Sequence, residues 1–276
     1  MEFLIVCPLV FVAGFIDAIA GGGGLVSLPA YLIAGVPVHT AIGTNKLSSG
    51  MGTTIATWQY AKSGFIPWRQ AIVCCIVALF ASGLGANLTL LIKEDFLRIV
   101  LLIILPATAI YLMFHKDFGS KEKDYSRTKV MILSMLTAFC VGVYDGFYGP
   151  GTGTFLLLLL TGFAGMKLTT ANGIAKTINL STNIAALAVM LVNGKVFLLL
   201  GFTAGLFNML GNYIGTKLFK KGGVNVARPI IIIVISHRIH KRIADSINTP
   251  ITAAALPLQN KDHTFIRQTK MWSSLR

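Results

Sequence analysis

Long apolar stretches recur along the chain, separated by short polar connections. The pattern predicts helices at 3–20, 40–60, 70–92, 96–114, 128–148, 170–192, 196–219 and from 226 onward. Most of these stretches are close to the ~20 residues that a helix needs to cross a hydrocarbon core. A transmembrane β-strand would alternate apolar and polar residues over about ten positions, and residues 72–92 do not. The sequence therefore predicts an all-α integral membrane protein of about seven or eight transmembrane helices.

Two further apolar pieces, 25–35 and 154–165, are too short to cross a bilayer alone. Each follows a glycine cluster, at 21–24 in the first case and at 149–153 in the second. Glycine disfavours a helix by about 1 kcal/mol per residue, and Pro150 lacks a backbone donor. We therefore expect a broken or re-entrant helix at each cluster. Unwound backbone within a bilayer must be buried in protein or line a wet cavity.

The same motif occurs twice. Asp17 lies four residues before the first glycine cluster, and Asp145 lies four residues before the second. Each cluster is followed by a lone lysine in an otherwise uncharged stretch, Lys46 in one copy and Lys176 in the other. An offset of about 130 also aligns Gly43 with Gly173, Gly64 with Gly194, Gly85 with Gly215 and Arg98 with Arg228.

This duplication divides the chain into four predicted parts. They are a first transmembrane repeat at 1–115, a charged linker at 116–130, a second transmembrane repeat at 131–235 and a polar basic tail at 236–276. Duplicated halves with paired broken segments are the sequence pointer to the central site of a transporter.

Composition supports a membrane protein. Of the 276 residues, 54% are hydrophobic and 12% are charged, whereas soluble domains carry about 25% charged residues. The mean hydropathy is +0.73. The net charge of +14 lies mainly in short connections and the tail, which favours basic loops beside anionic lipid over nucleic-acid binding. With eight crossings, the Lys/Arg counts of about eight and about seven on the two sides leave the orientation open.

The four cysteines, Cys7, Cys74, Cys75 and Cys140, lie in apolar segments without metal-ligand or disulfide spacing. We interpret them as small core hydrophobes. A membrane-embedded enzyme or assembly factor for sulfur transfer would need a reactive thiol at an aqueous mouth, and apolar surroundings suppress the thiolate. We therefore expect neither an enzyme nor a cofactor or metal site.

The first segment has one feature of a signal peptide, because Ala18 and Ala20 imitate a cleavage site. However, the segment begins with Glu2 and has no basic residue before its apolar stretch. A signal peptide normally has a positively charged start. We therefore expect this segment to remain in the protein.

The two aspartates and two lysines are the candidate chemical groups. A charged side chain near the bilayer centre costs from about 2.5 kcal/mol upward, so it persists where it faces a partner or a cavity. The aspartates could cap amides freed at the breaks or serve a proton-linked pathway. The lysines could snorkel to the interface or line a pathway. Polar neighbours favour the pathway for the lysines: Thr44, Asn45, Ser48 and Ser49 in one half, and Thr177, Asn179, Ser181 and Asn183 in the other.

The glycine clusters favour an anion as the cargo. Neither cluster follows a predicted strand, as a nucleotide-binding loop would. Backbone amides at the starts of half-helices bind anions through unpaired N–H groups and the positive end of the helix dipole. Together with two lysines, they predict a site for a small anionic substrate.

These residues also resemble a known family. Segment 14–29 with Asp17 and its four glycines, segment 43–47 with Lys46, and segment 63–69 closely resemble the sulfite exporter (TauE/SafE) permeases. Segments 147–153 and 171–176 resemble the second half of the same family, so the likeness covers about 3–235. It implies a multi-pass permease of the bacterial inner membrane that moves sulfite, organosulfonates or related sulfur oxyanions. The family usually ends in a full apolar helix, whereas the apolar stretch 229–235 ends abruptly here.

The resemblance implies a site and a set of partners. The substrate-binding candidates are Gly21, Gly22, Gly23, Gly24, Asn45, Lys46, Gly149, Gly151, Thr152, Gly153, Asn172 and Lys176, with Asp17 and Asp145 for proton coupling. No catalytic residue, cofactor or metal is implied. The expected partners are a small anion and the lipid bilayer, without nucleic acid, and a homo-oligomer is compatible with the sequence. A membrane-embedded enzyme or assembly factor and a passive anion channel are the alternatives.

Overall fold

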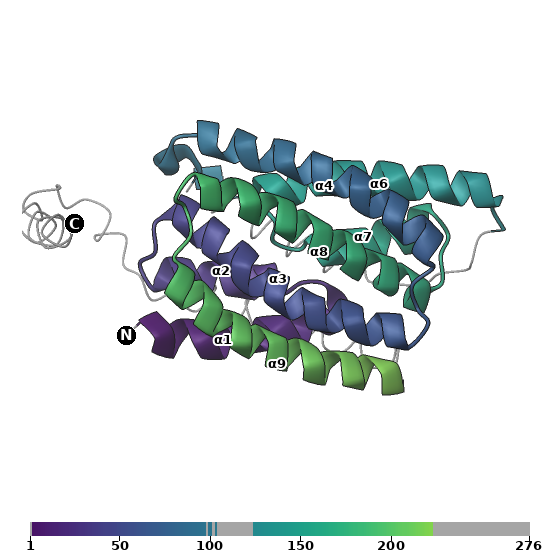
Figure 1. The fold of residues 1–276 in the computed structure, drawn as a ribbon, viewed down its shortest axis with the longest axis horizontal. Helices are drawn as coiled ribbons and strands as arrows, with labels where there is room; N and C mark the ends of the chain where they lie inside the picture. The colour runs from purple at the N-terminus through teal and green to yellow at the C-terminus, as the bar shows by residue number, and fades with distance from the viewer. Residues whose placement is uncertain (1, 98, 101–102, 104–123, 223–276) are drawn as a thin grey trace, which may run out of the picture. The chain divides into compact units, whose positions relative to one another are not determined.

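The computed structural model describes residues 2–97, 99–100, 103 and 124–222, and its regular elements there are all helical (Figure 1). In chain order they are α1 (Glu2–Ala20), α2 (Gly24–Ile33), α3 (Val38–Lys62), α4 (Trp68–Leu91), α6 (Arg127–Phe147), α7 (Thr152–Leu158), the π-helical turn η1 (Leu159–Phe163), α8 (Leu168–Val192) and α9 (Leu198–Gly222). Six of the predicted long helices are confirmed by α1, α3, α4, α6, α8 and α9. The predicted helix from 226 onward and the tail lie outside the described residues, as does most of the predicted helix at 96–114.

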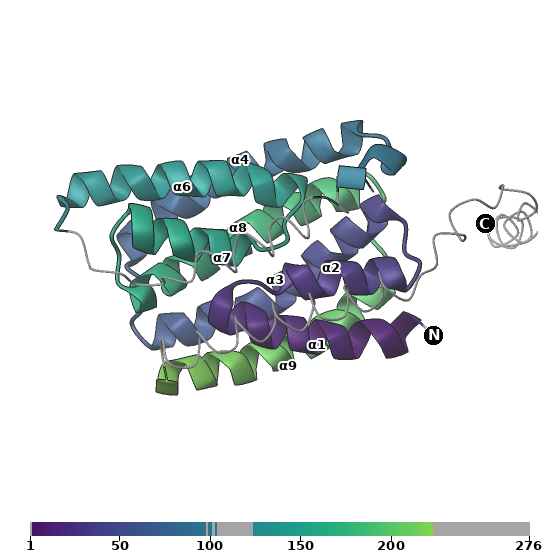
Figure 2. The same ribbon diagram turned by 180° about the vertical axis from the view of Figure 1, so that it is seen from behind.

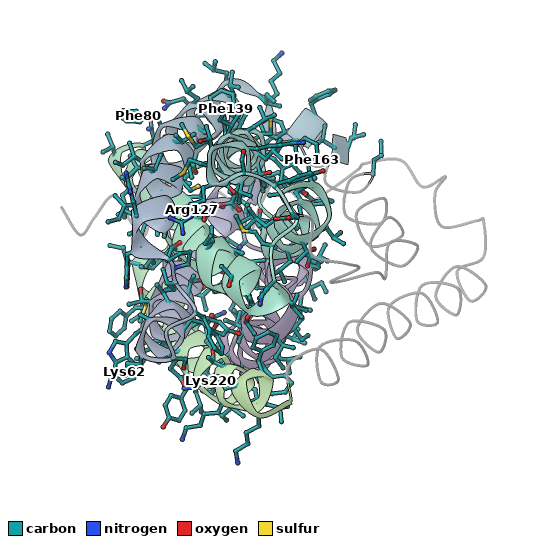
Figure 3. All side chains as sticks on the ribbon, turned by 90° about the vertical axis from the view of Figure 1, so that its right-hand side faces the viewer. Lys62, Phe80, Arg127, Phe139, Phe163 and Lys220 are labelled. Atoms are coloured by element: carbon teal, nitrogen blue, oxygen red, sulfur yellow. The ribbon has the colours of Figure 1, made fainter. Side chains whose placement is uncertain are left out.

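Five of the described helices are long and apolar enough to cross a membrane: α1, α4, α6, α8 and α9. Helix α3 is also 25 residues long, but its polar residues lower its hydropathy. The outer surface is apolar, as the side chains of Phe80, Phe139 and Phe163 illustrate (Figure 3). Along α4 the exposed residues Ile72, Ile76, Phe80, Leu84 and Leu88 recur at every fourth position and form one lipid-facing stripe. The all-helical, multi-span membrane protein predicted from the sequence is confirmed.

The helix breaks at both glycine clusters, as predicted. Helix α1 ends at Ala20, and Gly21 has a left-handed φ of +76° before α2 begins at Gly24. Helix α6 ends at Phe147, and Gly151 with φ +85° precedes α7. Each short helix turns back beside the long helix before it, so each break forms a helical hairpin (Figure 2).

The helices form two groups, and each group contains one long helix from the other half of the chain. The first group contains α1, α2 and α3 together with α9, which packs on α1 and α3. The second group contains α6, α7 and α8 together with α4, which packs on α6 and α8. Helices α3 and α8 lie against each other and join the groups (Figures 1 and 2).

Glycines allow these helices to pack at close range. A Cβ on Gly85 of α4 would lie 2.1 Å from the carbonyl oxygen of Val143, and one on Gly211 of α9 would lie 2.1 Å from that of Phe11. Such small-residue contacts are the usual means by which helices associate in a bilayer, where the hydrophobic effect does not drive them together.

One prediction about the cysteines is wrong. Cys7 and Cys74 are buried and Cys75 is half-buried, but Cys140 is exposed on the outer face of α6. It lies on the same face as the exposed residues Ile132, Leu136 and Phe139. A weakly polar thiol is tolerated beside hydrocarbon, so an apolar segment alone does not place its cysteine in the core.

Candidate functional site

Two ion pairs connect the helix groups. Lys46 Nζ on α3 lies 2.8 Å from Asp145 Oδ2 on α6, and Lys176 Nζ on α8 lies 2.8 Å from Asp17 Oδ2 on α1. Each lysine therefore pairs with the aspartate of the other half of the chain. The lysine side chains are only 2% and 1% exposed, so neither snorkels to the interface.

Each lysine also binds a helix end. Lys46 Nζ donates to the main-chain oxygen of Asp145 over 2.6 Å, and Lys176 Nζ donates to that of Asp17. Both carbonyls belong to the last turn before a break, where the helix dipole presents its negative end. The lysine charge is thus balanced by a carboxylate and by a helix C-terminus together.

The two aspartates differ in their surroundings. Asp145 Oδ1 accepts a 2.6 Å hydrogen bond from the Thr152 hydroxyl, and this side chain is 3% exposed. The side chain of Asp17 is 13% exposed, and among the described residues its carboxylate binds Lys176 Nζ and no threonine hydroxyl. In both cases the carboxylate binds side chains, rather than capping the amides of the following short helix. Asp17 is therefore the more accessible and less constrained acid.

The two breaks meet each other. A Cβ on Gly21 would lie 2.1 Å from the carbonyl carbon of Gly153, so the two backbones are in direct contact. Close by, the Thr154 hydroxyl donates to the Ala20 carbonyl over 2.8 Å. Only glycine permits this approach, because both positions lack room for a side chain.

A polar cavity of about 20 Å³ lies beside this crossing. Its walls come from both helix groups: Asp17, Gly21, Gly24, Asn45, Lys46, Ser49, Asp145, Gly149, Thr152, Gly153, Asn179 and Asn183. This volume holds about one water molecule. Both lysines are paired internally in this arrangement.

The structure brings most of the predicted site residues together. Gly22, Gly23, Gly151 and Lys176 do not line the cavity but adjoin residues that do. Asn172 is an exception, because its amide donates to the Tyr60 hydroxyl over 3.0 Å and it lines no part of the cavity. Its side chain braces α8 against α3.

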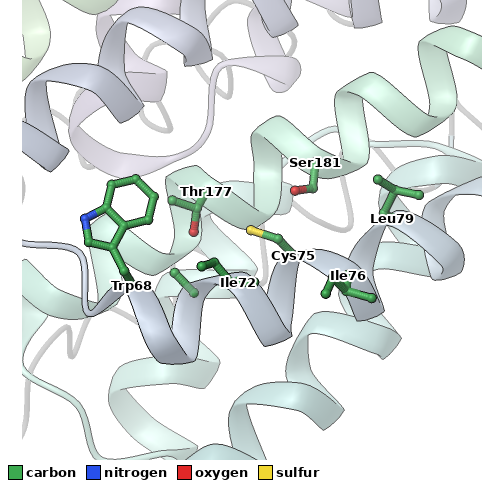
Figure 4. A pocket seen from close by; sticks show the side chains of 8 residues that line it. Trp68, Ile72, Cys75, Ile76, Leu79, Thr177 and Ser181 are labelled. Carbon is green, nitrogen blue, oxygen red and sulfur yellow. The ribbon is translucent and has the colours of Figure 1, made fainter.

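Ser49, Asn179 and Asn183 also line the cavity, although the sequence indicated them only as polar neighbours of the lysines and not as substrate-binding residues. The signal was present in the helical spacing, because Asn179 and Asn183 lie three and seven residues after Lys176 and share its helix face. Thr177 and Ser181 were interpreted as interior lining, but they face α4 and an outer pocket (Figure 4).

The site has no arrangement suited to a metal. Within the part of the chain that the structure describes, no group of three or more His, Cys, Asp or Glu side chains could hold one. Its chemistry is that of paired charges, amides and hydroxyls, which suits a polar or charged cargo.

Comparison with known proteins identifies the family. The family model described as "Sulfite exporter TauE/SafE" matches residues 6–237. The chain is 34% identical over 234 residues to the "Probable membrane transporter protein ORF9" of Sinorhizobium sp, covering 85% of this chain and 88% of that protein. It is 33% identical over 224 residues to a "Probable membrane transporter protein" of Haemophilus influenzae, covering 81% and 88%.

A third relative is the "Probable membrane transporter protein YfcA" of Escherichia coli strain K12. The chain is 32% identical to it over 234 residues, covering 85% of this chain and 87% of that protein. No solved structure matches. These bacterial relatives are named as probable membrane transporters, and the family is one of transporters, not of enzymes. The chain belongs to the sulfite exporter TauE/SafE family of multi-pass membrane transporters.

Proposed function

We propose that the protein is a permease for small sulfur oxyanions, namely sulfite or organosulfonates, and that its substrate site is the polar cavity between the two breaks. The observation that carries this proposal is the pair of buried Lys–Asp contacts joining the two helix groups. A charge buried within a membrane protein persists where it has a function or a partner. Here each lysine has an anionic partner that a substrate anion can replace.

The mechanism follows from exchange of the lysines' partners. An entering oxyanion competes with a carboxylate for the ammonium group of Lys46 or Lys176. A carboxylate left without its lysine is strongly disfavoured in a buried site, by about 3 to 5 kcal/mol. Protonation of that carboxylate removes the penalty, so anion binding and proton uptake favour each other.

Asp17 is the proton acceptor in this mechanism. Its side chain is the more exposed of the two acids, and no threonine hydroxyl binds its carboxylate as Thr152 binds Asp145. Proton and anion therefore move in the same direction. Asp145, Thr152 and Lys46 form the more rigid pair.

The two halves serve as inverted repeats in this proposal. Matched contacts support it, because Gly85 of α4 packs on the carbonyl of Val143 while its counterpart Gly215 of α9 packs on that of Phe15. Helices α1 and α6 run in opposite directions (Figure 2). Transport then consists of one helix group rocking against the other around the site where the breaks meet.

Flux into proteoliposomes tests the substrate and the coupling. We expect saturable uptake of sulfite and of a sulfonate. The sulfonate is chosen so that its charge is constant over the pH range used. Uptake of both anions should rise when the outside is made more acidic. In Asp17→Asn, this stimulation should disappear while exchange of internal for external anion continues. A passive channel would show uptake that ignores the pH gradient in the wild type. Persistence of the stimulation in Asp17→Asn would contradict the role of Asp17.

The charges at the two ends of the bundle give its orientation. One end carries Lys62, Arg69, Arg127, Lys129, Lys167, Lys217, Lys220 and Lys221 with the acid Asp124; Figure 3 looks onto this end. Among the residues that the structure describes, the opposite end carries Lys93 and Lys195 with the acids Glu2, Glu94 and Asp95. Because short cytoplasmic connections are rich in lysine and arginine, the first, basic end faces the cytoplasm.

Cysteine labelling tests this orientation. In a background without the four native cysteines, Thr128→Cys at the basic end should resist a membrane-impermeant thiol reagent in whole cells and react after the cells are opened. Asn193→Cys, at the opposite end, should react in whole cells. The reverse pattern would contradict the assignment.

A further inference from the structure

A second pocket opens on the outer surface between α4 and α8. Its volume is about 180 Å³, and its walls are Trp68, Ala71, Ile72, Cys75, Ile76 and Leu79 of α4 with Thr177 and Ser181 of α8 (Figure 4). Trp68, Ile72 and Ile76 are each more than half exposed. The pocket is therefore open toward lipid and separate from the polar cavity.

The corresponding contact in the other helix group is filled. There Leu47 and Met51 of α3 pack on Gly201 and Gly205 of α9, where a Cβ on Gly205 would lie 2.2 Å from Met51 Sδ. With the offset of about 130 residues, Thr177 of the second half aligns with Leu47 of the first half, and Ser181 aligns with Met51. Shorter side chains at these two positions of α8 leave the space between α4 and α8 open.

The surroundings indicate what fills it. The walls are almost wholly apolar, which disfavours a hydrated anion and suits a hydrocarbon chain. Trp68 and the exposed Arg69 lie in the first turn of α4, at the basic end of the bundle. Tryptophan is typical of the membrane–water interface, and a cation there attracts anionic lipid headgroups.

We propose that this outer pocket seats one acyl chain of an anionic phospholipid, with Trp68 and Arg69 beside its headgroup. The site requires the short side chains of Thr177 and Ser181. It lies on the opposite side of α8 from Asn179 and Asn183, which line the polar cavity. A lipid held there packs against α4 and α8 within one helix group and leaves the junction of the groups free.

Native mass spectrometry of the purified protein, equilibrated with phosphatidylglycerol and phosphatidylethanolamine, tests the proposal. We expect the wild type to retain one phosphatidylglycerol. Thr177→Leu/Ser181→Met, which copies the filled contact, should retain at least about tenfold less. Arg69→Gln should lose the preference for phosphatidylglycerol. Thr54→Leu adds bulk to an exposed position of α3 and should behave as the wild type.

Photo-crosslinking of the unmodified wild type gives a readout that does not depend on any variant folding. A phosphatidylglycerol with a diazirine in its acyl chain should label the peptides that contain Cys75 and Ser181 more strongly than the stretch that contains the exposed residues Leu84 and Leu88. Equal labelling of both regions would overturn the proposal, as would equal lipid retention by the filled variant. If the wild type forms dimers and the variant Thr177→Leu/Ser181→Met does not, the pocket is an interface with a second copy of the chain, and the lipid proposal is wrong.

Discussion

Replacing Lys46 with methionine should lower the free energy of unfolding by about 3 to 5 kcal/mol and abolish anion flux. Methionine keeps most of the volume of the lysine stem but leaves Asp145, whose side chain is 3% exposed, without a counter-charge. The main-chain oxygen of Asp145 loses its 2.6 Å hydrogen bond as well. Unfolding in detergent, followed by circular dichroism, measures the stability, and proteoliposome uptake measures the flux.

The double variant Lys46→Met/Asp145→Asn separates structure from transport. Since a buried ion pair can be replaced by neutral side chains at little cost, most of the lost stability should return. Flux should not return, because the cation that exchanges carboxylate for substrate is gone. Lys62→Met removes an exposed lysine that lies over Trp58 and should cost no more than about 1 kcal/mol. Restored flux in the double variant would show that the pair is structural only.

The variant Gly21→Ala should be strongly damaging, because it combines a backbone clash with a positive φ. Its Cβ would lie 2.1 Å from the carbonyl carbon of Gly153, and the φ of +76° is strained for any L side chain. The left-handed conformation costs about 1 to 2 kcal/mol, and overpacking adds about 1 to 3 kcal/mol. Gly153→Ala meets the same contact from the other side, with its Cβ 2.5 Å from Gly21 Cα.

We expect both alanine variants to lose at least about tenfold in flux and to melt at a lower temperature. Gly83→Ala is the matched control, because its Cβ would meet nothing within 4 Å and alanine is the better helix former by about 1 kcal/mol. Size-exclusion profiles, melting temperatures and uptake rates of the three variants provide the comparison. Wild-type flux in Gly21→Ala would mean that the backbones of the two breaks separate without loss of function.

The sequence predicted the features that local physics determines. Helix lengths follow from apolar stretches, and the breaks follow from the poor helix propensity of glycine and from Pro150. The isolation of Lys46 and Lys176 in uncharged helices was enough to select them as candidate site residues, and both lysines are buried in the structure. Asn179 and Asn183 were named only among the polar neighbours of Lys176, and the helical period from Lys176 onward separates them from Thr177 and Ser181, which face the outer pocket.

Contacts between distant segments could not be predicted in this way. Nothing in the residue types indicates that Lys46 pairs with Asp145 rather than with Asp17 of its own half, because that choice depends on how the halves interleave. The bracing role of Asn172 and the exposure of Cys140 also depend on which face of a helix is covered. The sequence also left the orientation open, because it does not show which connections share one end of the bundle.

The most direct test of the proposed site is the equilibrium binding of sulfite to the purified protein, measured by titration calorimetry in oxygen-free buffer. Wild type and Gly83→Ala should bind one sulfite with equal affinity. Lys46→Met and Lys176→Met, each confirmed to be folded by circular dichroism, should lose at least about tenfold in affinity, or about 1.4 kcal/mol. Unchanged affinity in both lysine variants would contradict the assignment of the substrate site to the paired lysines.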